Sequence, residues 1–176
     1  MKEIKDFLDP KSFSQLHNFI CGHDFPWKLC ISMTPQDKNP YFTHMFYDNF
    51  KSVTPTYEQY IIPMLYQLNC ATILQARANL FVSDVFDYSG WHADITFVKG
   101  KTAILYLNDC DGGTQFKIND KLHFVKAEAN KVVIFDNTIM HRAVNSKTVK
   151  TRFIINLNYV ENLEPSVLSD LRIQEK

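Results

Sequence analysis

Residues 101–160 read KTAILYLNDC DGGTQFKIND KLHFVKAEAN KVVIFDNTIM HRAVNSKTVK TRFIINLNYV. Short runs rich in apolar, β-branched and aromatic residues alternate here with turn sequences such as Asp111-Gly112-Gly113 and Asn119-Asp120. With the residues that precede this stretch, we expect strands at 73–82, 91–97, 102–108, 114–118, 121–126, 131–136, 141–145 and 151–160. A succession of short strands with no helix between them predicts a sandwich or jelly roll, because a parallel sheet needs a helix in each crossover.

The first third of the chain has a different pattern. Asp9-Pro10 predicts the start of a helix that ends near Gly22, and a short strand is expected around 27–33. Residues 35–52, with many aromatics, are expected to form a long loop or irregular cover. A second helix is predicted after Thr54-Pro55, with an apolar stripe formed by Tyr57, Tyr60, Ile61, Met64, Leu65 and Leu68. Pro63 predicts a kink or an early end of this helix.

The length of 176 residues suits one domain with a substantial core. We expect a single domain over 1–176, with a helical and irregular N-terminal cover (1–71), a jelly-roll core (72–160) and a C-terminal tail (161–176). The predicted fold class is therefore mostly β with flanking α, the N-terminal helices packing on one sheet. The tail carries enough apolar residues for one further short helix.

Composition excludes several classes of function. Formal net charge is +0, so strong non-specific nucleic-acid binding is not expected, because that needs an excess of Lys and Arg to neutralise phosphates. The N-terminus does not resemble a signal peptide, and the sequence has no apolar run of membrane-spanning length. The 4 cysteines are widely separated, which favours reduced thiols and a cytoplasmic location over disulfides or a cysteine zinc site.

Three residues form a candidate metal site. On a strand, residues i and i+2 point to the same face, so Trp91-His92-Ala93-Asp94 would place His92 and Asp94 side by side. His141 lies several strands later, where a jelly roll can bring the chain back to the same end of the barrel. Two imidazoles and one carboxylate leave three metal positions open, which is the facial triad of non-haem Fe(II) oxygenases. His-x-Asp alone is a weak signal, however, and surface polarity explains most such pairs.

Residues further along the chain strengthen this interpretation. Arg152 starts the last predicted strand, at the barrel mouth or inside it, and a buried guanidinium needs an anionic partner. That strand supplies no acidic residue, whereas a dicarboxylate ligand would match the fork geometry of arginine. A solvent-facing Arg152 is the plain alternative. Tyr106 shares a strand face with Ile104, and a buried tyrosine hydroxyl also favours a carboxylate partner, although such a residue is commonly plain core.

The order and type of these residues resemble the prolyl-4-hydroxylase-like group of 2-oxoglutarate/Fe(II) oxygenases. The resemblance covers about residues 72–160. Its small stand-alone members, many of them encoded by viruses of bacteria, share an Arg-x-Asn-Leu strand like Arg77-Ala78-Asn79-Leu80. The matching residues are His92, Asp94, Tyr106-Leu107-Asn108, Gly112-Gly113-Thr114-Gln115-Phe116, Val133-Ile134-Phe135, His141 and Arg152.

The resemblance implies a double-stranded β-helix, the topology of a jelly roll, with Fe(II) held by His92, Asp94 and His141. It implies that Arg152 and Tyr106 bind the distal carboxylate of 2-oxoglutarate, with Asn156 as a third contact. It also places Asn79 against the cosubstrate or the substrate. The spacing departs from the usual one, because Arg152 lies eleven residues after His141. The loop Asn145–Thr151 must therefore bulge, and Lys150 is the weaker rival for the role of Arg152.

The implied activity is a hydroxylase that consumes 2-oxoglutarate and O2 and releases succinate and CO2, with ascorbate as a candidate reductant. A cupin-like binding module without redox activity and a structural protein on a degenerate oxygenase fold are the alternatives. The sequence leaves the primary substrate open, whether protein residue, nucleobase or small molecule. It leaves the oligomeric state open too. The face carrying Gln75, Arg77 and Asn79 is either a pocket wall or a solvated surface, and Tyr88 and Trp91 either shape an entrance or simply pack. For a virus-encoded protein, the location would be the host cytoplasm.

Overall fold

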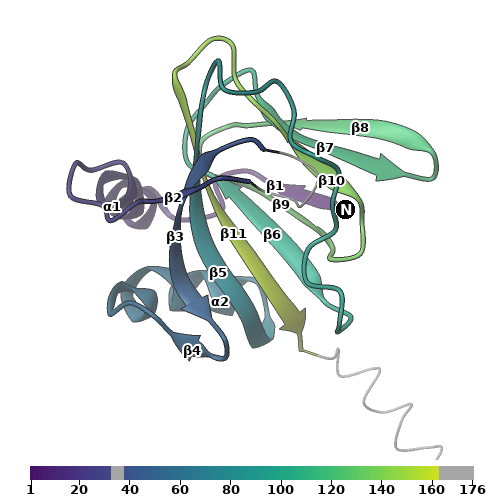
Figure 1. The fold of residues 1–176 in the computed structure, drawn as a ribbon. Helices are drawn as coiled ribbons and strands as arrows, with labels where there is room; N and C mark the ends of the chain where they lie inside the picture. Colours follow the sequence, from purple (N-terminus) through teal and green to yellow (C-terminus); the bar gives the residue numbers. More distant parts are fainter. Residues whose placement is uncertain (33–37, 163–176) are drawn as a thin grey trace, which may run out of the picture.

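The computed structural model describes residues 1–32 and 38–162, and within them the chain forms two antiparallel sheets (Figure 1). The major sheet is 8-stranded, with the order β1-β9-β6-β11-β5-β3-β2 and β4 paired to β3. Its strands are β1 (Lys2–Ile4), β2 (Lys28–Cys30), β3 (Tyr41–Asp48), β4 (Lys51–Ser52), β5 (Cys70–Val82), β6 (Lys101–Tyr106), β9 (Lys131–Asp136) and β11 (Thr151–Glu161). The 3-stranded minor sheet has the order β10-β7-β8, with β7 (Gly113–Ile118), β8 (Lys121–Lys126) and β10 (His141–Val144). This arrangement is the predicted mostly β jelly roll.

Strand β11 lies at the centre of the major sheet, between β5 and β6. Its side chains alternate between two environments, as the period of a strand requires. Ile155, Leu157 and Tyr159 face the core cluster that contains the helices. Arg152 and Ile154 face the opposite side, where a second core cluster joins the major sheet to the minor one. The candidate site therefore lies between the two sheets.

The first helix follows the predicted local rules. Helix α1 (Pro10–Ile20) starts with Asp9 as its N-cap, whose carboxylate accepts the backbone N–H groups of Lys11 and Ser12 at 3.1 and 3.0 Å. Pro10 stands in the first turn, where its missing N–H has no consequence. Leu16 and Ile20 are buried against the major sheet, so the helix packs on the sheet face away from the site.

The second predicted helix begins as a π-helical turn, η1 (Tyr57–Ile61), and continues as α2 (Ile62–Gln67). Pro63 lies in the first turn of α2, which is why the hydrogen-bonding pattern changes at this point instead of the helix breaking. Met64 and Leu65 are buried in the same core cluster as α1. None of the described helices is long and apolar enough to cross a membrane.

Two predicted segments are wrong. Residues 35–52 are not a long irregular cover, because within the described part β3 pairs with β5 inside the major sheet. The run Tyr41–Asp48 is apolar and aromatic with little polar alternation, so the two-residue period of a strand cannot be recognised in its sequence. Residues 91–97 do not form a strand; only an isolated bridge joins His92 to His141. The division at residue 71 stays a prediction, although β1, β2 and β3 show that residues before it build the sheet.

The other predicted strands match the structure to within a few residues. The long connection between His141 and Arg152 crosses from the minor sheet to the major one, which explains its length. Asp111 holds this loop by accepting hydrogen bonds from Ser146 Oγ at 2.7 Å and from the backbone N–H of Lys147 at 3.0 Å. The predicted helix in the tail lies outside the described residues.

Candidate metal centre and adjoining pocket

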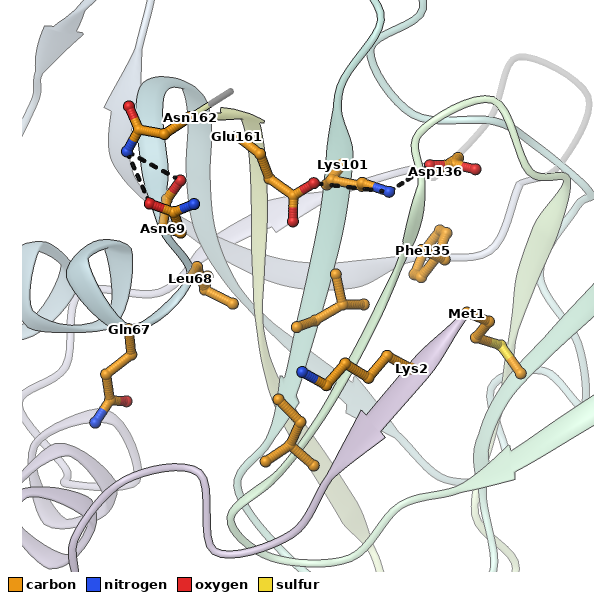
Figure 2. Close-up of a pocket in the computed structure, with 12 residues that line it drawn as sticks. Met1, Lys2, Gln67, Leu68, Asn69, Lys101, Phe135, Asp136, Glu161 and Asn162 are labelled. Atoms are coloured by element: carbon orange, nitrogen blue, oxygen red, sulfur yellow. Dashed lines mark hydrogen bonds and ion pairs between the residues drawn. The ribbon is translucent and has the colours of Figure 1, made fainter. Parts of the chain in front are cut away.

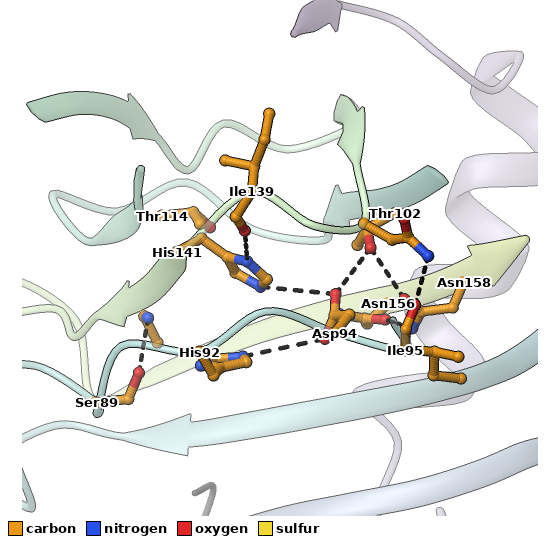
Figure 3. Close-up of polar contacts among 12 residues, drawn as sticks. Ser89, His92, Asp94, Ile95, Thr102, Thr114, Ile139, His141, Asn156 and Asn158 are labelled. Carbon is orange, nitrogen blue, oxygen red and sulfur yellow. Dashed lines mark hydrogen bonds and ion pairs between the residues drawn. The ribbon is translucent and has the colours of Figure 1, made fainter. Parts of the chain in front are cut away.

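His92, Asp94 and His141 converge, each offering one ligand atom, and these atoms lie within 4.8 Å of one another (Figure 3). His141 is the first residue of β10, whereas the other two residues belong to the connection between β5 and β6. The backbone N–H of His92 donates to His141 O at 3.0 Å, and that of His141 donates to His92 O at 2.8 Å. This reciprocal pair fixes the two imidazoles side by side, with ring centroids 4.4 Å apart.

The connection that carries Asp94 is not held by a strand ladder but by hydrogen bonds between side chains and backbone groups. Ser89 Oγ accepts the N–H of Ala143 at 2.8 Å, which attaches the segment before His92 to β10. The buried Asn137 donates to the carbonyls of Ile95 and of Val98, the latter at 2.8 Å, and so fixes the segment after Asp94. Thus His92 and Asp94 meet because a pinned loop bends there, and strand alternation is not the cause.

The imidazoles are oriented for ligation. Nδ1 of His92 lies 3.1 Å from Gly90 O, and Nδ1 of His141 lies 2.9 Å from Ile139 O. A carbonyl only accepts, so the proton of each neutral ring sits on Nδ1 and the Nε2 lone pair is free. Both Nε2 atoms face Asp94, at 4.0 Å for His92 and 3.6 Å for His141. Hydrogen bonds of this kind orient metal-binding histidines in proteins.

Electrostatics favour the ligand forms of these groups. Burial raises the pKa of Asp94, but the neighbouring His141, Arg77 and His92 and the Thr102 hydroxyl outweigh it, and the pKa is lowered overall. Burial lowers the pKa of His141, against the opposing effect of Asp94. At neutral pH the site therefore presents a carboxylate and a neutral buried imidazole, which are the forms that bind a metal.

A cavity between the sheets adjoins the cluster. It is lined by Arg77, Asn79, Phe81, His92, Ile104, Thr114, His141, Ala143, Arg152, Ile154 and Asn156. The predicted residues Asn79 and Asn156 therefore reach the same space as two of the histidines, and the face carrying Arg77 and Asn79 is a pocket wall. Gln75 does not line this cavity; its amide donates to Asp48 at 3.0 Å.

Arg152 lies at 0% exposure in this pocket, with its guanidinium 4.4 Å from the centroid of the Phe81 ring. None of its three side-chain nitrogens has a hydrogen-bond partner among the described residues. Lys150, the weaker sequence candidate, pairs with Asp84 at 2.9 Å and is exposed. Burying an unpaired charge is costly, so the cavity around Arg152 suits an anion.

Tyr106 is fully buried beside this guanidinium, and its hydroxyl donates to Thr114 Oγ1 at 2.8 Å. Burial raises the pKa of Tyr106, which keeps the hydroxyl protonated as a donor. Thr114 was among the matching residues in the sequence but had no assigned role, and Thr102 was missed. Thr102 could have been identified from the sequence, because it shares a strand face with Ile104 and Tyr106.

Tyr88 and Trp91 do not line the cavity. The guanidinium of Arg142 lies over both rings, 4.1 Å from the centroid of Tyr88 and 4.6 Å from that of Trp91. Lys117 lies over Trp91 as well, at 4.3 Å. These aromatic side chains therefore pack against cations beside the histidines.

A larger cavity, of about 370 Å³, lies elsewhere, between β1, the end of α2 and the end of β11 (Figure 2). Its charged wall is already compensated, since Lys101 pairs with Asp136 at 2.7 Å and with Glu161 at 3.7 Å. It brings together no cluster of metal-binding side chains among the described residues. Size alone does not make it the reactive site.

Comparisons with known proteins bear on the fold. No family model matches the chain, and no curated protein matches it. A 2OG-Fe(II) oxygenase family oxidoreductase from Burkholderia pseudomallei superimposes with a TM-score of 0.72 at 12% identity, over 90% of this chain and 83% of that one. A Pseudomonas putida prolyl-4-hydroxylase gives 0.68 at 15% identity, over 92% of each chain.

A third similar structure is a Trichoplax adhaerens prolyl hydroxylase in complex with a hypoxia inducible factor peptide fragment. Its TM-score is 0.66 at 11% identity, over 91% of this chain and 83% of that one. The fold is therefore the one that 2OG-Fe(II) oxygenases, prolyl hydroxylases among them, also adopt. At such low identities the likeness establishes the fold alone, and the chemistry must be argued from the residues of this chain.

Proposed function

We propose that this chain is an Fe(II)- and 2-oxoglutarate-dependent dioxygenase that hydroxylates a protein side chain or a small molecule. The observation that carries the proposal is a buried guanidinium that has no partner among the described residues and lies in a cavity lined by both histidines of a His-Asp-His cluster. Either feature alone has simpler explanations. Together they provide a cation that needs an anion and a metal site that keeps positions open.

The donor set fits Fe(II). Two neutral imidazole nitrogens and one carboxylate are a common set for non-haem Fe(II), and they leave three positions for other ligands. His92 and His141 would bind through Nε2, since Nδ1 of each is engaged by a backbone carbonyl. Asp94 would supply the negative charge, and its lowered pKa keeps it ionised.

The charge in the pocket suits a dicarboxylate. Arg152 would pair with the distal carboxylate of 2-oxoglutarate, because its guanidinium offers a fork of donors that has no hydrogen-bond partner among the described residues. Thr114 lines the same cavity, and it and Tyr106, whose hydroxyl donates to it, would add hydroxyl contacts. When bound, Fe(II), 2-oxoglutarate and O2 supply the oxidising chemistry that releases succinate and CO2. The residues of the chain bind, orient and exclude water.

Anaerobic titration with Fe(II) and 2-oxoglutarate tests this proposal directly. The oxygenase should develop a weak visible metal-to-ligand absorption band, whereas a cupin-like module that holds a metal without binding 2-oxoglutarate to it should not. His92→Ala and Asp94→Ala should abolish both the band and substrate-free 2-oxoglutarate turnover. His123→Ala, at an exposed histidine of β8, is the matched control and should retain both. Wild-type turnover in Asp94→Ala would remove the case for that ligand.

The primary substrate can be sought through turnover. Screening peptides and small molecules for stimulated succinate release separates the two substrate classes. The Trichoplax neighbour was captured with a peptide, which is why peptides enter the screen. Stimulation by a member of one class, lost in Asp94→Ala, would assign the substrate.

A further inference from the structure

A buried polar chain connects Asp94 to two asparagines of β11 (Figure 3). Thr102 Oγ1 lies 2.8 Å from Asp94 Oδ2 and 2.9 Å from Asn158 Oδ1. The side-chain amide of Asn158 in turn lies 2.7 Å from that of Asn156. Thr102, Asn158 and Asn156 are at most 3% exposed, so water does not compete for these contacts. Thr102 and Asn158 are also paired across β6 and β11, so the sheet itself sets their spacing.

The number of available hydrogens decides which group donates and which accepts along this row of hydrogen bonds. A threonine hydroxyl has one hydrogen, and that hydrogen cannot serve both Asp94 and an asparagine oxygen. The carboxylate is the stronger acceptor, because a hydrogen bond to an ionised group is roughly twice as strong as a neutral one. The Asn158 oxygen would then lie 2.9 Å from the threonine oxygen with no hydrogen between the two atoms.

A half-turn of each terminal amide removes this conflict, because it exchanges oxygen and nitrogen and leaves the other atoms in place. Asn158 Nδ2 then donates to Thr102 Oγ1, and Asn156 Nδ2 donates to Asn158 Oδ1. Thr102 is left free to donate to Asp94, and each hydrogen bond along the chain polarises the next.

We propose that Thr102 is a positioning residue for Asp94, and that Asn158 and Asn156 orient its hydroxyl. The inference rests on the proposed metal site and deepens it. Asp94 sits on a loop, so a fixed hydroxyl from the rigid β6 would hold the carboxylate toward the two Nε2 atoms before metal binds. A β-branched side chain suits this role, because few rotamers are open to it on a strand.

Binding of Mn(II), followed by the loss of its free-ion EPR signal, tests the proposal without turnover. Thr102→Val keeps the shape but removes the hydroxyl, and metal affinity should fall about 10- to 100-fold, the usual effect of losing a contact to a metal ligand. Thr102→Ser restores the hydroxyl and should recover most of the affinity. Thr102→Ala serves as a second variant without the hydroxyl, in case valine disturbs folding.

Two controls separate the possible failures. Thr43→Val removes another buried threonine hydroxyl of the major sheet, one that lies 2.9 Å from Asn79 Oδ1, and should leave Mn(II) affinity unchanged. Asp94→Ala should abolish binding. If Asp94→Ala binds Mn(II) normally, the proposed metal site itself fails. If Asp94→Ala loses binding but Thr102→Val and Thr102→Ala bind like the wild type, only the positioning role is wrong. Equal losses in the Val and Ser variants would also overturn it, because packing would then be the cause.

Discussion

At the scale of single residues, Arg152 is a buried charge whose proposed partner is the carboxylate of a ligand. Its guanidinium is buried without a partner among the described residues, and burial lowers its pKa. Replacing buried ionic groups by apolar side chains of similar volume is often stabilising, by about 1–4 kcal/mol, because the desolvation cost is removed. A guanidinium at position 152 is therefore expected to lower the stability of the ligand-free protein.

We therefore expect Arg152→Met to raise the thermal midpoint of the ligand-free protein while weakening 2-oxoglutarate binding about 100-fold or more, since a buried charge pair is lost. Differential scanning calorimetry and anaerobic 2-oxoglutarate titration measure the two effects. Lys150→Met is the control, because that exposed lysine pairs with Asp84 at the surface. A destabilised Arg152→Met protein with intact 2-oxoglutarate affinity would show that the guanidinium is structural.

At the scale of elements, β1 attaches to the edge of the major sheet through charges as well as its ladder with β9. Glu128 lies 2.7 Å from Lys5 and 2.9 Å from Lys131, and Lys131 also pairs with Glu3 at 3.4 Å. Hydrogen bonds from Lys5 and Lys131 lower the pKa of Glu128 to about 2, from an ordinary value of 4.5. A carboxyl with a depressed folded pKa stabilises the fold above its unfolded pKa and loses that contribution as pH falls.

The contribution of Glu128 should therefore be fully present above about pH 5 and be lost between about pH 4.5 and pH 2. Glu128→Gln should lower the urea midpoint at pH 7 slightly, since the carboxylate is solvent-screened, and the difference from the wild type should vanish toward pH 2. Glu58→Gln, at an exposed residue with no ion pair in residues 1–32 and 38–162, is the control. A constant difference at all pH values would exclude the ionic explanation.

At the scale of the whole molecule, the candidate site is built from residues of both sheets. His141 belongs to the minor sheet, Arg152 belongs to the major sheet, and Asp94 lies on the loop between β5 and β6. A metal with a bound dicarboxylate would therefore contact all three parts at once. A ligand that binds only the folded state stabilises it by about 2.7 kcal/mol at 100 times its Kd.

We expect Mn(II) with N-oxalylglycine, a non-reacting 2-oxoglutarate analogue, to raise the thermal midpoint and to slow hydrogen exchange most strongly in β10 and in residues 88–98. Strands β2 and β4, at the far edge, should change little. Mass spectrometry of peptic fragments gives the comparison. Equal protection throughout the chain, or protection only around the larger cavity near β1, would place the ligand elsewhere.

Much of the architecture is predictable from local patterns. Asp9 and Pro10 mark the start of α1, and the glycine and asparagine turns separate β5 to β11, because capping and turn preferences act over a few residues. Tyr41–Asp48 could not be placed in the same way. Its run of aromatic residues has no clear alternation, and it becomes a strand because β5 offers an edge to pair with.

The residues of the candidate site can be identified in the sequence by their type and spacing. The sequence does not show why they come together in space. His92, Asp94, His141 and Arg152 stand out because imidazoles, a carboxylate and a guanidinium among apolar strands need partners. Only the tertiary structure decided that Asp94 sits on a loop pinned by Asn137, that Thr102 contacts its carboxylate, and that Asn158 contacts Thr102. These two contacts of Thr102 join residues 8 and 56 positions apart in the sequence. Strand register sets the one between Thr102 and Asn158, and register is a property of the assembled sheet that no local pattern contains.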